Sequence, residues 1–131
     1  MSTAREIVAA HYAASASGDI HGAFANFAEN ITWIESPGGA YAGEFHSMAE
    51  VFEKVFGRIQ ADWENFGAHL DYLIADNENN TAAAVVNYTG TFRATGKPQN
   101  TRVVQLWSIE DGKVVRFEQV VDSAQQNKSM S

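Results

Sequence analysis

The feature that most constrains the fold is a stretch near the C-terminus that reads as a β-hairpin. Two runs rich in valine and aromatic residues, Thr101–Ile109 and Val114–Asp122, are separated by four residues. Their centre, Asp111-Gly112, is typical of a two-residue turn, because both central residues of that turn take positive φ. This turn places Glu110 opposite Lys113, and the register of both strands follows from that pair.

In this register Trp107 faces Arg116 and Gln105 faces Glu118. One face of the hairpin then carries Val103, Gln105, Trp107, Ile109, Val114, Glu118, Val120 and Asp122, and the other carries Val104, Leu106, Val115, Phe117 and Val121. Neither face is purely polar, so we expect both to be covered. If helices pack on the first face, the apolar second face is too large to remain exposed to water. A second copy of the chain is the simplest partner that would bury it. The prediction is a homodimer through the convex sheet face, broken by Phe117→Glu.

Three helices are predicted ahead of this hairpin. Thr3-Ala4-Arg5-Glu6 and Ser47-Met48-Ala49-Glu50 both fit a capping box, and Asp19 can cap a short helix directly after Gly18. The buried positions expected in the short helix are Ile20, Ala23, Phe24 and Phe27. The third helix has apolar residues at helical spacing, namely Met48, Val51, Phe52, Val55, Phe56 and Ile59.

Strands are predicted at Ile31–Ser36, Asn65–Asp76 and Thr81–Thr95, with a bend at Gly90, and a polar tail follows at Ala124–Ser131. The expected face of the second of these strands is Phe66, Ala68, Leu70, Tyr72 and Ile74. The element order indicates one α+β domain over residues 1–131, in which an antiparallel meander curls around the helices. Such a cone has a mouth suited to a small-molecule pocket.

The amino-acid composition limits the binding partners and the cellular compartment that we expect. The formal net charge of -7 argues against a nucleic-acid or anionic-membrane surface, and the absence of cysteine favours a reducing compartment. No apolar run approaches the roughly 20 residues of a membrane span, and the N-terminal residues lack the pattern of a signal peptide. We therefore expect a soluble, cytoplasmic protein. The four histidines show no metal-ligand spacing and no phosphate-binding loop is present, so we expect neither metal nor cofactor.

Several phrases resemble the NTF2-like superfamily, specifically its SnoaL-like (polyketide cyclase-like) and ketosteroid isomerase-like branch. They are His11-Tyr12-Ala13-Ala14 with Gly18-Asp19, Trp33–Gly39 with Tyr41-Ala42-Gly43, Gln105-Leu106-Trp107, Asp111–Val115 and Val120-Val121-Asp122. The resemblance implies a cone-shaped α+β barrel of the NTF2-like or cystatin-like type, with three N-terminal helices packed in a curved, mostly antiparallel sheet. It also implies a homodimer and a deep hydrophobic pocket. Members include isomerases, cyclases, epoxide hydrolases, dehydratases and non-catalytic modules, so the fold does not choose the function.

The family's functional residues carry over poorly. The base aspartate of ketosteroid isomerases falls on Ser36, with Glu35 beside it, and their oxyanion tyrosine falls on His11, with Tyr12 adjacent. Their second oxyanion donor falls near Val104 or Gln105. The Arg-x-Asp pattern of the epoxide hydrolases is absent from the sequence. The aspartate that polyketide cyclases place low on the last strands is imitated by Asp122.

Three residues are the candidate catalytic groups: Glu35, Asp122 and His11. Glu35 shares a strand face with Trp33, where a dry site would raise its pKa for acid–base work. The alternatives are a solvated residue at the rim or a salt bridge with Arg116 or Arg102. Asp122 with Glu118 forms a carboxylate pair that can divide acid and base roles, or Asp122 is a surface charge. His11 is a catalyst or a core histidine.

The candidate ligand-binding residues are Tyr12, Trp33, Tyr88, Gln105, Trp107 and Glu118. The two tyrosines can donate to a ligand carbonyl or lie in the core with satisfied hydroxyls. Whether Trp33 and Glu35 or Ile34 and Ser36 point inward stays open. Two functions remain: an isomerase-, cyclase- or hydrolase-type enzyme using acid–base chemistry on an apolar carbonyl-bearing or cyclic substrate, or a non-catalytic binding or association module.

Overall fold

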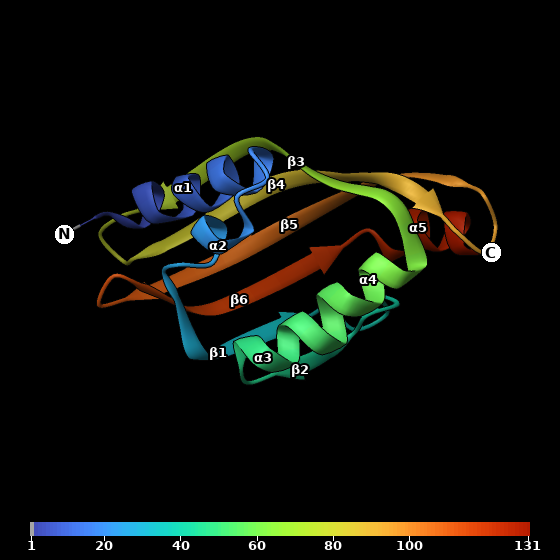
Figure 1. Cartoon of the computed structure of the whole chain (residues 1–131). Coiled ribbons are helices and arrows are strands. Elements are labelled where there is room, and N and C mark those ends of the chain that lie inside the picture. Colours follow the sequence, from blue (N-terminus) through green and yellow to red (C-terminus); the bar gives the residue numbers. More distant parts are fainter. Residues whose placement is uncertain (1) are drawn as a thin grey trace.

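The structure is a computed structural model that describes residues 2–131. Over this range the strands form one curved, six-stranded sheet in the order β2-β1-β6-β5-β4-β3. Their bounds are β1 Phe27–Glu35, β2 Gly43–Phe45, β3 Trp63–Asp76, β4 Thr81–Phe92, β5 Pro98–Glu110 and β6 Lys113–Val121. Neighbouring strands are antiparallel except β1 and β6, which are parallel. The fold is the predicted α+β arrangement, with a sheet that is curved and mostly antiparallel (Figure 1).

The helices line the concave side of the sheet. Helix α1 (Ala4–Ala16) and the short α2 (Ile20–Ala23) lie beside β3, β4 and β5, while α3 (Met48–Val51), the π-helical turn η1 (Phe52–Phe56) and α4 (Gly57–Asp62) run as one continuous rod (Figure 1). Both predicted N-caps start their helices, but only Thr3 and Glu6 form the full capping box. Glu50 accepts from the His46 N–H instead of the N–H of its cap, Ser47. The Thr3 hydroxyl accepts from the Glu6 N–H at 3.2 Å, and the Ser47 hydroxyl accepts from the Glu50 N–H at 3.1 Å. No helix within residues 2–131 is long and apolar enough to cross a membrane.

Several predicted boundaries are wrong. The expected polar tail is helix α5 (Ser123–Met130), whose N-cap is Asp122: its Oδ1 accepts from the Gln125 N–H at 3.2 Å. Strand β1 begins at Phe27, four residues earlier than predicted, so Phe27 reaches the core from a strand. Ile20, predicted to be buried, is 59% exposed because the second helix is only one turn long.

The hairpin turn forms as predicted, but its register slips by one residue farther along. Glu110 pairs with Lys113 across a turn in which Asp111 and Gly112 take φ of 50° and 76°. Ile109 then pairs with Val114 while Ser108 pairs with Arg116, so Val115 is an extra residue, a β-bulge. Because side chains alternate along a strand, the slip exchanges the faces of every later residue of β6.

The slip reverses three predictions for β6. Trp107 pairs with Phe117 instead of Arg116, and Gln105 pairs with Gln119 instead of Glu118. Phe117 is only 1% exposed and stacks on Trp33 with ring centroids 3.8 Å apart, so Phe117→Glu would put a charge in the core rather than test a dimer.

A second bulge divides β3. The ladder with β4 shifts between Leu70 and Tyr72, which leaves Asp71 unpaired. Ala68 and Leu70 pair with buried residues of β4, whereas Tyr72 and Ile74 pair with residues of the outer face; all four side chains are exposed. The predicted single apolar face of β3 is therefore wrong beyond Asp71.

Aromatic side chains fill the space between the helices and the sheet. Neighbouring rings lie in contact in this cluster, which comprises Tyr12, Phe24, Phe27, Trp33, Phe56, Trp107 and Phe117. These rings occupy the interior where the resemblance implied a deep apolar hollow. What remains is a small polar site at one end of the curved sheet, which is not closed into a barrel within residues 2–131.

Candidate functional site

The site is organised around Glu35, the last residue of β1. Trp33 and Glu35 point inward, which settles the orientation left open by the sequence, and Glu35 is only 6% exposed. Its Oε2 accepts from the Trp33 indole N–H at 2.9 Å, and its Oε1 accepts from the Gln119 amide N–H at 2.9 Å. Both carboxylate oxygens are thus held by neutral donors.

These contacts continue through the core as a connected network (the Glu35 network: Glu35, Trp33, Gln119, Tyr88, Gln105, Tyr12 and Trp107). The Gln105 amide donates to Gln119 Oε1 at 2.9 Å and to the Tyr88 hydroxyl at 3.0 Å. The Tyr88 hydroxyl donates to Gln119 Oε1, and the Tyr12 hydroxyl donates to Gln105 Oε1. Across residues 2–131, every buried side-chain nitrogen and oxygen has a partner.

Burial raises the pKa of Glu35 to about 7, although the hydrogen bond from Trp33 favours the ionised form. The predicted alternatives, a solvated carboxylate at the rim and a carboxylate paired with an arginine, are both wrong. Arg102 pairs with Asp71 at 2.7 Å, and Arg116 pairs with Glu118 at 3.2 Å. Glu35 is a buried carboxyl group whose hydrogen-bond donors are an indole and an amide.

The two tyrosines of the network are held as neutral donors. Burial raises the pKa of Tyr12 above its usual range. Burial also raises the pKa of Tyr88 well above its usual range, and the Glu35 charge adds to this rise. Both hydroxyls therefore stay protonated wherever Glu35 changes its charge.

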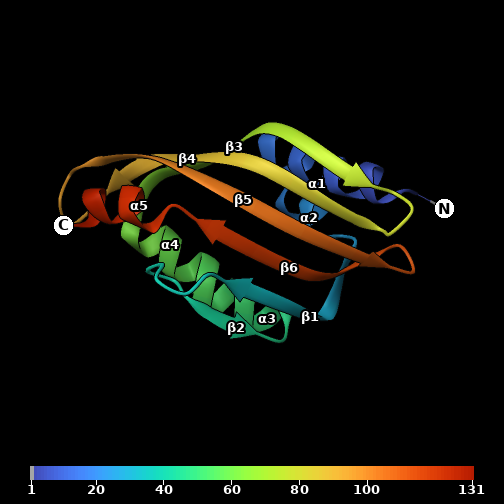
Figure 2. The same cartoon turned by 180° about the vertical axis from the view of Figure 1, so that it is seen from behind.

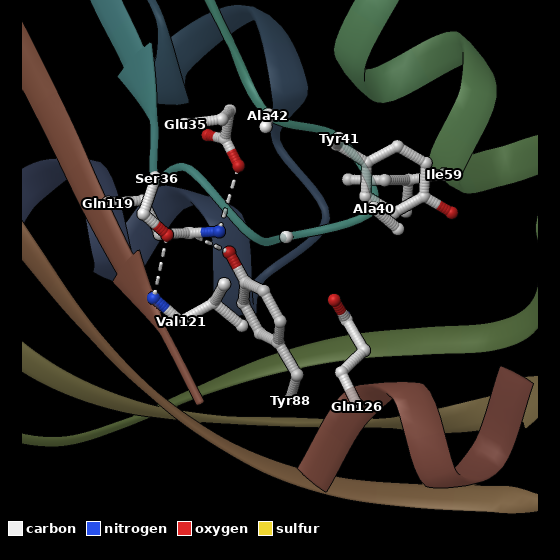
Figure 3. A pocket seen from close by; sticks show the side chains of 11 residues that line it. Glu35, Ser36, Ala40, Tyr41, Ala42, Ile59, Tyr88, Gln119, Val121 and Gln126 are labelled. Carbon is white, nitrogen blue, oxygen red and sulfur yellow. Dashed lines mark hydrogen bonds between the residues drawn. The ribbon is translucent and has the colours of Figure 1, made fainter. Parts of the chain in front are cut away.

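A cavity of about 10 Å³ lies beside Glu35, enough for roughly one water molecule. Tyr88 and Gln119 line it from the sheet, Ile59 from α4 and Gln126 from α5, and residues 39–42 of the loop after β1 cover it (Figure 3). The structure therefore shows a small, partly open polar space bordered by a carboxyl group.

The two covers of this cavity are held in different ways. In the loop, the Tyr41 hydroxyl donates to Asp62 Oδ2 at 2.7 Å and accepts from the Trp63 indole at 3.1 Å. Helix α5 buries only Gln126 and Ser129. Its contacts are polar: the Gln126 amide donates to Gln99 Oε1 at 3.3 Å and the Ser129 hydroxyl to the Pro98 carbonyl at 2.6 Å.

His11 lies in the aromatic cluster rather than at the cavity. Its Nδ1 is 2.7 Å from the Ala23 carbonyl oxygen, so Nδ1 carries the proton and donates. The rings of Phe24, Phe27 and Trp107 surround it at centroid distances of 5.0 to 5.3 Å. Burial lowers the pKa of His11, which keeps the ring neutral. Its position is that of a core histidine.

The other two predicted carboxylates also lie away from the cavity. Asp122 is exposed and caps α5, while Glu118 lies on the outer face of β6 beside Arg116. Tyr12, Trp33, Tyr88, Gln105 and Trp107 do meet in one network with Glu35.

Sequence reasoning missed Gln119, Tyr41 and Gln126. Gln119 stands next to the predicted Glu118 and enters the site because of the bulge in β6. Tyr41 follows the Pro-Gly-Gly turn after β1, and Gln126 lies three residues inside a helix whose cap, Asp122, was interpreted as the end of a strand. An N-cap pattern at Asp122 was the one available signal.

Comparison with known proteins gives a consistent result. The model of the SnoaL-like domain matches residues 8–117. An NTF2-like protein of Burkholderia thailandensis is 37% identical, with 100% of this chain and 99% of that chain covered and a TM-score of 0.93. No curated protein matches the chain.

Two more distant structures share the fold. TerC, co-crystallised with polyporic acid, is 18% identical over 98% of both chains, with a TM-score of 0.84. A protein of Catenulispora acidiphila with a ketosteroid isomerase-like fold, in complex with trimethylamine, is 17% identical over 95% of this chain and 92% of that chain, with a TM-score of 0.72.

Proposed function

The chain belongs to the SnoaL-like family of NTF2-like proteins, and we propose that it catalyses proton transfer with Glu35 as general base. The substrate class is an apolar, carbonyl-bearing or cyclic molecule, and the reaction is of the isomerase, cyclase or hydrolase type. One observation carries the proposal: a carboxyl group with a pKa of about 7 borders the cavity and is held only by neutral donors. A base is most effective when its pKa lies near the working pH.

The donors around Glu35 determine where a proton can go. An indole N–H and an amide N–H donate but do not accept a proton at neutral pH. A proton that Glu35 takes from a carbon next to a substrate carbonyl therefore stays on the cavity side, and the electron pair moves to the carbonyl oxygen. The neutral Tyr88 hydroxyl lines the same cavity, and its proton, which Gln119 Oε1 accepts in the structure, turns to that oxygen when a substrate is bound. Returning the proton to another atom completes an isomerisation.

Substrate entry requires a cover of the cavity to move, because the space holds only about one water. Helix α5 is the cover held without large apolar contacts, since Gln126 and Ser129 are its buried residues. TerC and the Catenulispora protein were each crystallised with a small molecule, which supports ligand binding by this fold as an analogy.

The test is hydrogen exchange on a panel of small ketones and lactones. The protein is incubated with each compound in D₂O, and NMR follows deuterium uptake at carbons next to the carbonyl. We expect uptake with the wild type and none with Glu35→Gln. Glu118→Gln, which removes the same charge from the outer face, is the matched control and should retain activity.

Absence of exchange with every compound, together with no small molecule retained in native mass spectrometry, would remove the enzyme proposal. The second function, a non-catalytic binding or association module, would then stand. The near-filled interior is the observation that favours it.

We also propose a homodimer through the convex face of the sheet, where the strands have α1 and α2 behind them (Figure 2). The apolar residues of this face are Tyr72, Ile74, Val85, Val104, Leu106 and Val120. Four of them, Tyr72, Ile74, Leu106 and Val120, are 39% to 60% exposed. A patch of this kind is more often covered than left in water.

Light scattering tests the dimer. Leu106→Glu should yield a folded monomer, and Ala61→Glu, on an exposed position of α4, should leave the dimer intact. A wild type that is monomeric at micromolar concentration would contradict the proposal.

We further propose that residues 1–131 form one domain, supported by the single sheet, and that it works in the cytoplasm, supported by the cysteine-free composition.

A further inference from the structure

The Glu35 network has an indole at each end, and this fixes the direction of its hydrogen bonds. An indole N–H only donates, so the Trp107 N–H, 3.1 Å from the Tyr12 hydroxyl, makes that oxygen an acceptor. The Tyr12 proton must then go to Gln105 Oε1. With its oxygen occupied, Gln105 turns its amide nitrogen toward the oxygen of Gln119.

The same logic reaches the carboxylate. Because Gln119 Oε1 accepts from Gln105, its Nε2 is the atom left to face Glu35 Oε1, at 2.9 Å. The other oxygen of Glu35 faces the Trp33 N–H at 2.9 Å. Amide orientations are normally a choice between two flips, and here the two indoles remove that choice.

A protonated Glu35 needs an acceptor, and the network offers none in its present direction. Gln119 would have to flip to present its oxygen, which turns its amide toward that of Gln105, so Gln105 must flip too. The Gln105 amide then donates to the Tyr12 hydroxyl. That hydroxyl already accepts from Trp107, and its own proton is left without an acceptor in a buried site.

We propose that Trp107 is a positioning residue for Glu35. Its indole N–H sets the direction of the network through Tyr12, Gln105 and Gln119, so that a donor always faces the carboxylate and Glu35 is held as a base. The use of that base in catalysis rests on the proposed function, whereas its control by Trp107 does not.

The titration of Glu35 can report the effect of Trp107 because few other groups near Glu35 change their charge. The titratable groups that share its cavity are Tyr88 from β4 and Tyr41 from the loop. Tyr12 from α1 is connected to Glu35 only through the amides of Gln105 and Gln119. Strand β6 presents Gln119, α4 presents Ile59 and α5 presents Gln126. Among the described residues that line the cavity, none is a lysine, arginine or histidine.

The test is the titration of the Glu35 carboxyl carbon by NMR, assigned by its loss in Glu35→Gln. In Trp107→Phe a water molecule can occupy the space left by the indole N–H and accept the Tyr12 proton, so the network can reverse and a protonated Glu35 gains the Gln119 oxygen as acceptor. We expect the midpoint of the Glu35 titration to move upward. The pH dependence of the Gln119 side-chain amide signals should appear at the same midpoint.

Trp63→Phe is the matched control. Trp63 is a second buried indole, it donates to a tyrosine hydroxyl (Tyr41) at the same 3.1 Å, and it lies outside the network. The midpoint should not rise in this variant, because loosening Tyr41 in the loop over the cavity would bring water closer to Glu35 and favour its ionised form. Trp33→Phe, which removes a direct donor to Glu35, should move the midpoint upward.

Tyr12→Phe provides a second route if Trp107→Phe does not fold. It cuts the link between the indole and Gln105, so both amides can flip, and the midpoint should again rise. An unchanged midpoint in a folded variant would overturn the proposal. A lowered midpoint would overturn it too, because it reports water reaching Glu35 itself. Neither reading depends on finding a substrate, so failure of the exchange assay leaves this test intact.

Discussion

Replacing Glu35 by Gln should change how the stability of the protein depends on pH. Burial raises the pKa of this carboxyl group from an ordinary 4.5 to about 7. Between these two pH values the folded protein binds a proton that the unfolded chain releases. The free energy of unfolding therefore falls as the pH rises through this window, and the contribution of the protonated form is lost above about pH 7.

The size of the effect follows from the two pKa values. Each tenfold change in proton affinity is worth about 1.4 kcal/mol, so the gap between 4.5 and about 7 corresponds to a loss of about 3 kcal/mol. That is a large share of the roughly 5–15 kcal/mol that holds a domain folded. The exposed fraction of Glu35 is small enough that solvent screening does not remove it.

Urea unfolding at a series of pH values measures this loss. The quantity to follow is the wild-type free energy of unfolding minus that of Glu35→Gln, so that other titrating groups, including the buried His11, cancel. We expect this difference to fall by about 3 kcal/mol between pH 4.5 and pH 8. At low pH this difference also includes the cost of placing a glutamine amide against two hydrogen-bond donors. Only the change of the difference with pH therefore reports the ionisation of Glu35.

Glu118→Gln is the control, because it removes the same formal charge from the outer surface. Its difference from the wild type should lack the decline seen with Glu35→Gln. A difference for Glu35→Gln that stays flat over the same pH range would refute the reasoning. It would mean that Glu35 ionises as if it were solvated, and the base assigned to the site would lose its physical ground.

Three further predictions concern the scaffold. Asp122→Ala removes the N-cap of α5 and should lower stability by about 1 kcal/mol, measured by urea unfolding, with faster proteolysis near the C-terminus. Phe117→Ala empties the space against Trp33 and should cost about 3–5 kcal/mol by the same measurement. Gly112→Ala meets no neighbouring atom but takes φ of 76°, so its cost of about 1 kcal/mol should be purely conformational.

The sequence predicted those parts of the fold that depend on short-range chemistry. Thr3 and Ser47 cap their helices, and Asp111-Gly112 turns the hairpin, because each of these features needs only a few adjacent residues. The bulge at Val115 has no such mark. Val115 differs little from the valines around it, and neither glycine nor a turn residue indicates where the ladder shifts.

The bulge at Val115 determines which side chains of β6 enter the candidate site. Without the bulge, Glu118 would face inward and Gln119 outward, and the core would hold two carboxylates. With it, an amide takes the inner position and Glu35 is the carboxyl group of the network. His11 and Tyr12 show the same sensitivity in a helix: adjacent residues point about 100° apart, so Tyr12 enters the network and His11 does not.

The cost of Glu35 is itself an argument about its role. A glutamine at position 35 would remove the charge that loses about 3 kcal/mol above pH 7, so folding alone does not call for a carboxylate there. Yet the surroundings suit the ionised form, with a donor on each oxygen and an indole at each end of the network. Glu35→Gln can be measured both for stability and for deuterium uptake by the substrate. If the variant gains stability relative to the wild type as the pH rises, and also no longer catalyses this uptake, then the same carboxylate weakens the fold and performs the chemistry. A variant that loses exchange without that pH-dependent gain would instead indicate that the base is not the buried group described above.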